Sequence, residues 1–523
     1  MSFEFFRRKY REKIMNIKEA KQEIVQTIEA YTSKTPRGEY SIPTVHQRPL
    51  LLIGPPGIGK TAVMAQAARE CQAGFVSYTM THHTRQSAIG LPFIREQSFG
   101  GKSYSVTEYT MSEIIASVYR CMEETGCRKG LLFLDEINCV SETLAPAILQ
   151  FLQNKTFGPH RLPQGWVIAA AGNPPEYNKS VREFDLATLD RLKVLYVEAD
   201  FPAWEEYAAL AGIHSAVLSY LRLHPDSFYQ ISQSSSQKAY ATARGWEDLS
   251  YLLLEYEALG YAVTEQVIFP YISVEEISHD FFAYYQLCRK WDGALPVSGF
   301  FMKEPEARNS LLEKLQKSSP EEAMYLVQLL LSRLRHDLRE ESQKHSRRTL
   351  YREMFEKLER FLSQDGAAQK SAFALMEEFL QKEREVLEIR FTHNLSDSRE
   401  YSDTKGVLLQ LSKLRYQLSP QVYQPEEALS ELKTLWENTL DPEGEETSAV
   451  TQKLEASLEL LEESENDTAL SFFLSSLLSD PNLAEHLALH PSSAYEKACR
   501  RFQYTRREKE LKEKLSSLFT DTP

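Results

Sequence analysis

Short apolar runs alternate with longer segments of helical spacing in the first 200 residues of the chain. The runs cover residues 49–53, 131–134 and 166–171, and their length and lack of polar positions are typical of strands buried on both faces. The segments between them carry apolar residues at the spacing of a helix. This order predicts a doubly wound parallel sheet with helices on both faces.

Helical spacing dominates from about residue 200 onward. An apolar stripe at positions 327, 330, 331, 334 and 338 follows a helix start signal at Ser319 and Pro320. Thirteen glycines lie in residues 1–172, whereas only three follow residue 300, so the turn-rich part of the chain comes first. We therefore expect an N-terminal helical segment (1–39), an α/β core (40–200), a helical lid (201–292) and a mostly helical C-terminal region (293–523) with a possible break near 440–449.

Composition narrows the class of protein. The chain has 523 residues and a formal net charge of -14, which disfavours a protein whose main task is coating nucleic acid. Its six cysteines form no C-x-x-C pair, so the sequence indicates neither a zinc site nor a disulfide framework. Without an apolar leader or a membrane-length apolar stretch, we expect a cytoplasmic protein that does not enter a membrane.

A glycine-rich loop follows the first apolar run and precedes a helix-forming stretch. In this setting backbone N–H groups converge on phosphate oxygens, and the helix presents its positive end to the same charge. We expect Lys60 to reach the β- and γ-phosphates and the Thr61 hydroxyl to hold Mg²⁺. The predicted nucleotide-binding residues are Gly54, Pro55, Pro56, Gly57, Ile58, Gly59, Lys60 and Thr61.

Two further apolar runs end in polar residues that suit phosphate chemistry. Asp135 and Glu136 close the run at 131–134, where an aspartate can hold Mg²⁺ and a glutamate can polarise an attacking water. Asn173 follows the run at 166–171, and its amide is suited to sense the γ-phosphate or to orient that water. The predicted metal ligands are thus Thr61 and Asp135, and the predicted catalytic residues include Glu136 and Asn173.

Two arginines complete the candidate set. Arg191 precedes the apolar stretch 192–197, and Arg244 lies at the start of a predicted helix whose apolar face includes Trp246 and Leu249. An arginine placed beside the transferred phosphoryl group neutralises the charge that develops there. Taken alone, both residues would be expected to form surface ion pairs.

Taken in order, these motifs are similar to those of MoxR-like AAA+ ATPases, which are related to the ATPase subunits of magnesium chelatases. The resemblance covers residues 40 to about 290 and implies an AAA+ P-loop NTPase core with a helical lid, ATP and Mg²⁺ as ligands, and ATP hydrolysis. It implies Walker A at Lys60 and Thr61, Walker B at Asp135 and Glu136, sensor 1 at Asn173, an arginine finger at Arg191 and sensor 2 at Arg244. Arg182 is the alternative for the finger.

The same resemblance implies partners. An arginine finger acts across a subunit boundary, which implies a ring oligomer, usually a hexamer. Residues 90–107, with Gly100 and Gly101 between two alternating runs, predict a hairpin that resembles the family's helix-2 insert, and residues 153–165 resemble the hairpin before sensor 1. MoxR-like rings commonly remodel or mature a protein client together with a von Willebrand factor A domain partner.

Two other functions remain open from the sequence. A nucleic-acid-stimulated AAA+ motor would need basic residues on the first hairpin, yet Arg95 and Lys102 are offset by Glu96 and Glu108. A small P-loop kinase-like enzyme would share the phosphate loop but would not need a ring. The C-terminal region 293–523 contains no motif that identifies it.

Overall fold

The computed structural model of the chain describes residues 14–82, 88, 90–177, 181, 184–233, 238–292, 300–362, 372–417, 430–435 and 449–500. These residues fall into two compact units. Unit 1 comprises Met1–Ala203 and Thr349–Leu440, and unit 2 comprises Trp204–Arg348 and Asp441–Pro523. The C-terminal region 293–523 is therefore divided between both units.

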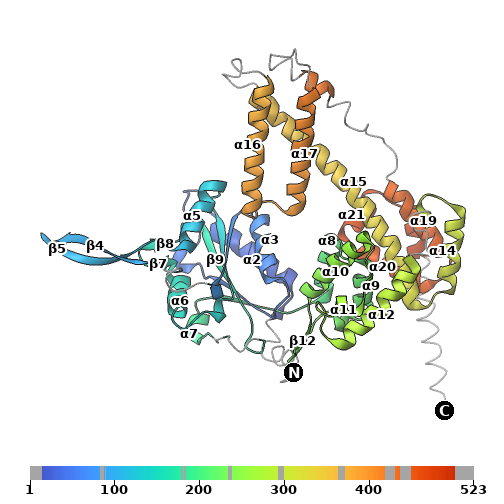
Figure 1. Ribbon diagram of the computed structural model, residues 1–523, viewed down its shortest axis with the longest axis horizontal. Helices are drawn as coiled ribbons and strands as arrows, with labels where there is room; N and C mark the ends of the chain where they lie inside the picture. The colour runs from blue at the N-terminus through green and yellow to red at the C-terminus, as the bar shows by residue number, and fades with distance from the viewer. Residues whose placement is uncertain are drawn as a thin grey trace. The chain divides into compact units, whose positions relative to one another are not determined.

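A six-stranded sheet forms the centre of unit 1 (Figure 1). All its neighbouring strands pair in parallel, and the spatial order β1-β10-β2-β9-β6-β3 requires crossovers. The three strands expected from the apolar runs are present as β2, β9 and β6, which confirms the predicted sheet. In spatial order the strands are β1 (Ile14–Met15), β10 (Lys193–Val197), β2 (Leu50–Ile53), β9 (Trp166–Gly172), β6 (Gly130–Asp135) and β3 (Gly74–Thr79).

Helices cover both faces of this sheet, which explains why its central strands are apolar throughout. On one side, Leu51 packs in a cluster with residues of α5 (Glu113–Thr125) and α6 (Ala145–Asn154). Helices α2 (Ile17–Thr32) and α3 (Lys60–Glu70) contact one another and the sheet. The fold is thus a doubly wound AAA+ type α/β core, as the sequence predicts.

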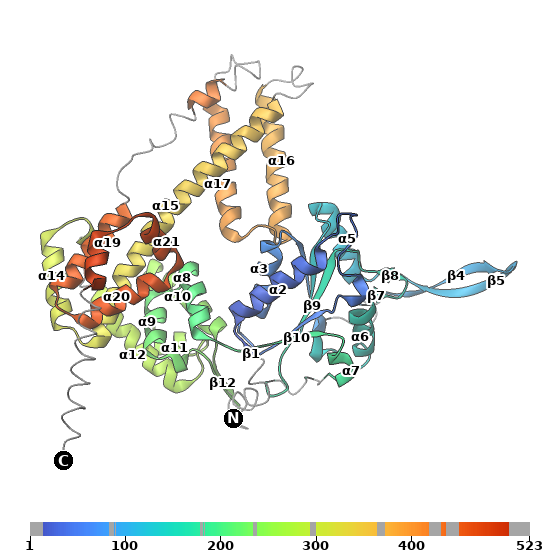
Figure 2. The same cartoon turned by 180° about the vertical axis from the view of Figure 1, so that it is seen from behind.

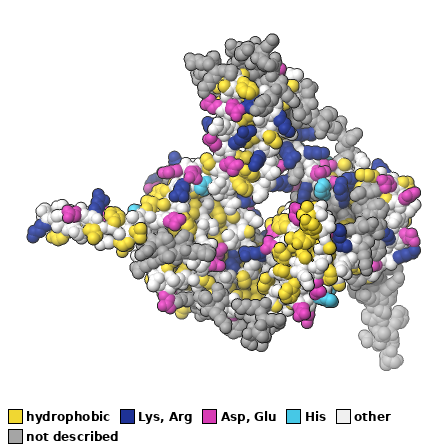
Figure 3. Space-filling view, viewed as in Figure 1, with side chains coloured by type: hydrophobic (Ala, Val, Ile, Leu, Met, Phe, Trp, Pro, Cys, Tyr) yellow, Lys and Arg dark blue, Asp and Glu magenta, His cyan; other side chains and the backbone are white. Residues whose placement is uncertain are grey.

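Two hairpins extend from this core. Strands β4 (Pro92–Phe99) and β5 (Lys102–Tyr109) pair antiparallel around Gly100 and Gly101, whose φ angles of 58° and 80° are strained for residues with a side chain. The ribbon projects from unit 1 and carries exposed apolar side chains along its length (Figure 3). The shorter hairpin joins β7 (Thr156–Phe157) to β8 (His160–Arg161), and both predicted hairpins are confirmed.

A helical bundle from the C-terminal half of the chain also belongs to unit 1. It comprises the end of α15 (Pro320–Leu362), α16 (Ala372–Thr392) and α17 (Ser398–Gln417) around a common apolar core. The turn between α16 and α17 lies against the core helices (Figures 1 and 2). There Arg69 of α3 contacts Asn394 at 3.3 Å and Asp397 at 3.7 Å.

Unit 2 contains two packed groups of helices. In the first, the aromatic rings of Tyr220, Trp246 and Phe281 pack at 5.2 to 5.8 Å between centroids. In the second, the first part of α15 packs with C-terminal helices around an apolar cluster. The first group contains α8 (Phe201–Ala211), α9 (Ser215–Leu223), α10 (Ala243–Leu259), α11 (Glu265–Ile268), α12 (Glu275–Asp292) and the strands β11 (Gln230–Gln233) and β12 (Lys238–Ala241). The second group contains the first part of α15 together with α14 (Pro305–Lys317), α19 (Ala449–Glu463), α20 (Asp467–Ser479) and α21 (Pro481–Leu489).

Helix α15 begins where the sequence predicts. The Ser319 hydroxyl accepts from the Glu322 amide, and the Glu322 carboxylate accepts from the Ser319 amide, which forms a capping box. The helix then continues for 43 residues, far beyond the predicted apolar stripe, and it passes from unit 2 into unit 1.

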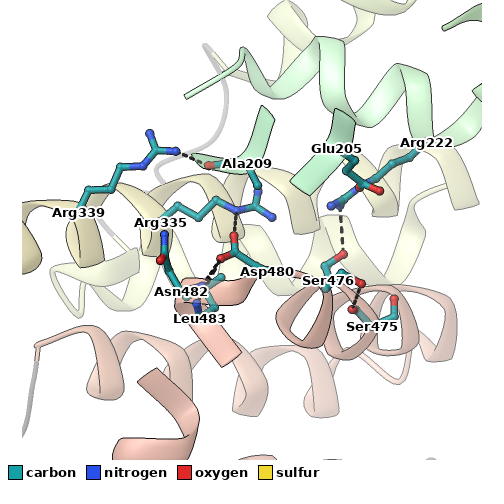
Figure 4. A network of polar contacts seen from close by, with 11 residues as sticks. Glu205, Ala209, Arg222, Arg335, Arg339, Ser475, Ser476, Asp480, Asn482 and Leu483 are labelled. Atoms are coloured by element: carbon teal, nitrogen blue, oxygen red, sulfur yellow. Dashed lines mark hydrogen bonds and ion pairs between the residues drawn. The ribbon is translucent and has the colours of Figure 1, made fainter. Parts of the chain in front are cut away.

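Buried polar contacts lie within and between the two helix groups of unit 2 (Figure 4). Arg335 of α15 donates from Nε to Asp480 at 2.7 Å, and both residues are more than nine-tenths buried. Arg222 of α9 pairs with Glu205 of α8 and donates to the Ser476 hydroxyl of α20 at 3.1 Å. The Arg222–Ser476 hydrogen bond thus connects a lid helix to a C-terminal helix within unit 2.

Candidate functional site

The phosphate loop lies between the carboxyl end of β2 and the start of α3. Gly57 and Gly59 have φ angles of 76° and 88°, which residues with a side chain rarely adopt. Gly59 is the N-cap of α3 and makes no side-chain cap hydrogen bond. The N–H groups of a helix's first turn are a favourable place for an anion. The position of Gly59 is open, because an added Cβ would meet nothing within 4 Å.

Lys60 lies at the centre of the site. Its Nζ donates to the carbonyl oxygens of Gly54 at 2.8 Å and Pro55 at 2.9 Å, and to Oδ1 of Asn173 at 2.8 Å. The ammonium group therefore joins the loop after β2 to the end of β9, two strands that are neighbours in the sheet. The structure brings Lys60 and Asn173 together, although 113 residues separate them.

Thr61 and Asp135 meet beside the loop. The Thr61 hydroxyl donates to Oδ2 of Asp135 at 2.7 Å, and Oδ1 of the same carboxylate accepts from the amide of Glu136 at 2.9 Å. A hydroxyl and a carboxylate are hard oxygen donors of the kind that hold Mg²⁺ next to a bound phosphate. The two predicted metal ligands thus lie in contact, and their chemistry fits that ion.

Glu136 leaves the end of β6 with a left-handed backbone, φ 54°. Its Oε2 accepts a hydrogen bond of 2.7 Å from the hydroxyl of Thr81 in η2 (Met80–His82), which follows β3. Sequence reasoning missed Thr81, because the run that forms β3 includes Ser77 and Tyr78 and was not recognised as a strand. Recognising β3 as a strand paired with β6 was the one way to predict from sequence that Thr81 lies near Glu136.

Asn138 is a second residue that the sequence analysis missed. It lies in η3 (Ile137–Cys139), directly after Glu136, and only 5% of its surface is exposed. Its Nδ2 donates to the backbone carbonyl of Asn173 at 2.8 Å. Asn173 is thereby held at its side chain by Lys60 and at its backbone by Asn138.

A cavity of about 210 Å³ lies on the far side of η3. Its lining is mostly apolar and comes from η3, α6 and α7 (Leu186–Leu189), with Asn138 and Asp185 among the few polar members. Next to it, burial raises the pKa of the Cys139 thiol, and the Glu136 carboxylate adds to that effect. The protein environment behind Glu136 is therefore largely apolar.

The structure does not bring either predicted arginine to the loop within unit 1. Arg191 follows α7 and is exposed, and among the described residues no hydrogen bond or ion pair joins its side chain to the phosphate loop. Helix α7 itself is capped by Asp185, and its hydrogen bonds to Thr188 lower the pKa of that exposed carboxyl. Arg244 is an exposed residue of α10 in unit 2, and Arg182 lies outside the described residues.

The fold and this site define a P-loop nucleotide-binding domain of the AAA+ class. Residues 49–192 match the AAA domain of the dynein-related subfamily, so the chain contains an AAA domain. Two solved structures of RuvB point variants from Thermotoga maritima are similar at 15% identity; they cover 50% and 49% of this chain and 71% and 69% of their own, with TM-scores of 0.28 and 0.27. No curated protein matches the chain.

None of the described helices combines the length and the apolar character needed to cross a bilayer.

Proposed function

We propose that this protein is an ATP-hydrolysing ring of the MoxR type that remodels or matures a partner protein. The single observation that carries the proposal is the set of hydrogen bonds around the phosphate loop. Lys60 donates to the loop carbonyl of Gly54 and to Asn173, and Thr61 donates to Asp135. These residues come from three separate strand ends. Their convergence is expected of a site for a nucleotide and its magnesium ion.

In this proposal the loop residues Gly54 to Thr61 bind the phosphates of ATP. Lys60 turns from its carbonyl partners to the β- and γ-phosphates, where it neutralises charge. Thr61 and Asp135 hold Mg²⁺, which supplies electrostatic stabilisation of the phosphate oxygens when it is bound. The preference for ATP over GTP rests on the family resemblance.

Glu136 and Asn173 act on the attacking water. The Glu136 carboxylate accepts the proton of the water as hydrolysis proceeds, and the Asn173 amide orients the water or contacts the γ-phosphate. Asn173 follows β9, which pairs with β2, and Glu136 follows β6, which pairs with β9. Both lie at carboxyl ends of parallel strands, which is where ligands bind in open α/β sheets.

Two arginines complete the proposed machinery from other places. Arg191 is exposed after α7, which suits a finger that serves the site of a neighbouring subunit in a hexameric ring. Arg244, in the lid (residues 201–292), is the sensor 2 residue that the family resemblance implies. The client, a partner with a von Willebrand factor A domain and a cytoplasmic location follow from the family resemblance.

Two substitutions test the nucleotide site. Lys60→Ala should abolish ATP binding and hydrolysis, measured by titration with a fluorescent ATP analogue and by phosphate release. Glu136→Gln should retain binding and lose hydrolysis, and its stable ATP state is suited to trap the client for identification. Wild-type turnover in Lys60→Ala would reject the site, and wild-type turnover in Glu136→Gln would remove Glu136 from its role.

A nucleic-acid motor is the second candidate. The β4–β5 ribbon has the basic residues Arg95 and Lys102. Arg95 forms an ion pair with Glu108 at 3.5 Å, which makes the ribbon less suited to bind a phosphate backbone. Stimulation of ATP turnover by DNA or RNA at moderate salt would favour the motor over the protein remodeller.

A further inference from the structure

Asn138 connects the two catalytic strand ends. It lies two residues after Glu136, and its Nδ2 donates to the Asn173 carbonyl at 2.8 Å across the boundary between β6 and β9. Among the described residues, its side chain has one further polar contact, a weak one in which Oδ1 lies 4.0 Å from the Cys139 thiol. The amide of this buried side chain is therefore directed at Asn173.

The Asn138 side chain also lies close against Gly172, the residue before Asn173. A Cβ added to Gly172 would lie 2.7 Å from Oδ1, 2.8 Å from Cγ and 2.9 Å from Nδ2 of Asn138. These three atoms are the nearest to that position, and they belong to one residue. Gly172 therefore lets the Asn138 amide approach the backbone at the end of β9.

We propose that Asn138 is a positioning residue that sets the distance and orientation between Glu136 and Asn173. The inference rests on the proposed ATP hydrolysis and adds a residue to it. Asn138 holds the backbone of Asn173 while Lys60 holds its side chain. When Lys60 turns to phosphate, Asn138 remains as the contact that keeps the Asn173 amide aligned with the turn that carries Glu136.

The geometry separates this role from nucleotide binding. Asn138 donates to neither the phosphate loop nor the Thr61–Asp135 pair, so its loss leaves their hydrogen bonds intact. Asn138 also lines the mostly apolar cavity beside η3. Removing the amide should therefore lower kcat for ATP and leave KM and nucleotide affinity nearly unchanged.

Asn138→Ala, Gly172→Ala and the double variant test the proposal. Gly172→Ala alone should destabilise the protein, because its Cβ collides with Asn138. In the double variant the new methyl group occupies the space that Asn138 vacates, so we expect the Tm to recover. We expect kcat to stay about 10-fold below wild type, with KM within about 2-fold, in both Asn138→Ala and the double variant.

Asn138→Asp is the matched variant for the donor itself. It keeps the shape of the side chain and replaces Nδ2 with an oxygen that cannot donate when ionised, so the same loss of kcat is expected. Hydrogen exchange of a peptide covering residues 170–177 gives a readout without turnover, and exchange should rise in the double variant.

The outcomes are distinct. Wild-type kcat and wild-type exchange in the double variant would overturn the proposal, since Asn138 would then only fill space beside Gly172. A weaker affinity for nucleotide with unchanged kcat would overturn it as well. If wild-type protein does not hydrolyse ATP, the proposed function fails, and the exchange experiment still decides whether Asn138 holds the end of β9.

Discussion

The Thr81 hydroxyl donates a 2.7 Å hydrogen bond to Oε2 of Glu136, so the carboxylate proposed to activate water is held by the neighbouring strand end. A hydrogen bond to a charged group contributes about 1.5–3 kcal/mol. Thr81 therefore restrains the Glu136 carboxylate.

Thr81→Val should release this restraint with little change in shape. We expect basal ATP turnover to rise severalfold, measured by steady-state phosphate release without client. Thr81→Ser keeps the hydroxyl and serves as the control, which should stay near wild type. A fall in turnover in Thr81→Val would instead mean that Thr81 orients Glu136 for catalysis.

The Arg335–Asp480 pair should dominate the stability of unit 2. Asp480 also accepts from the amides of Asn482 and Leu483 at the start of α21, so Asp480→Ala leaves a buried arginine unpaired and a helix uncapped. Breaking a buried pair costs about 3–5 kcal/mol, which thermal or urea unfolding would detect.

Matched variants separate the pair from ordinary surface effects. Lys317→Ala breaks an exposed pair with Glu313 and should change the free energy of unfolding far less than Asp480→Ala does. Replacing Arg335 with Met and Asp480 with Leu together should recover most of the loss, because no uncompensated charge remains. A loss below 1 kcal/mol in Asp480→Ala would contradict the importance of this contact.

Lys155 should give the protein a specific pH dependence. It is 4% exposed, its Nζ donates to Oε1 of Gln47 at 2.9 Å, and burial lowers its pKa from 10.5 to about 8. The unfolded chain thus binds more protons than the folded one between these pH values. The cost of burying the cation, roughly 3 kcal/mol, is fully present below pH 8 and is relieved as pH rises toward 10.5.

Lys155→Met removes this titration. The free energy of unfolding of the variant, minus that of wild type, should be largest at pH 7 and should shrink by pH 10. The difference isolates Lys155, because burial raises the pKa of Cys71 and Cys121 to about 11 in both proteins and destabilises both at high pH. Urea unfolding at each pH measures it, and a constant difference would contradict the assigned shift.

Arg191 is expected to serve a neighbour's site. Arg191→Ala should lower turnover about 10³-fold or more while ATP binding persists. Mixing these subunits with Lys60→Ala subunits should restore part of the activity, because each variant supplies what the other lacks. Activity that does not recover on mixing would indicate that Arg191 acts within its own chain or not at all.

The sequence identified the parts of the site that follow strong apolar runs. Lys60, Asp135 and Asn173 each come after such a run, and the parallel sheet brings their strand ends together. Thr81 and Asn138 were missed for different reasons. Thr81 follows a strand with polar positions, and the role of Asn138 depends on a contact with a backbone carbonyl 35 residues away, which no local pattern encodes.

For the fold too, features set by neighbouring residues could be predicted from the sequence, whereas contacts between distant segments could not. The start of α15 was predicted from Ser319 and Pro320, because a capping box is a local signal. The docking of the α16–α17 turn was not predicted, since it depends on Arg69 meeting Asn394 and His393 meeting Glu124. These are polar contacts between segments about 300 residues apart, and their side chains are ordinary surface types.

Helix α15 belongs partly to unit 1 and partly to unit 2, which limits where the chain can be divided into fragments for expression. A fragment that ends near residue 300 keeps every proposed catalytic residue but loses the bundle after Thr349, which belongs to the same compact unit as the phosphate loop. It would also lose the partners of Arg69 at the last turn of α3. The compact unit that contains the phosphate loop is therefore not a contiguous stretch of sequence, and an expressed fragment must include both of its segments, Met1–Ala203 and Thr349–Leu440.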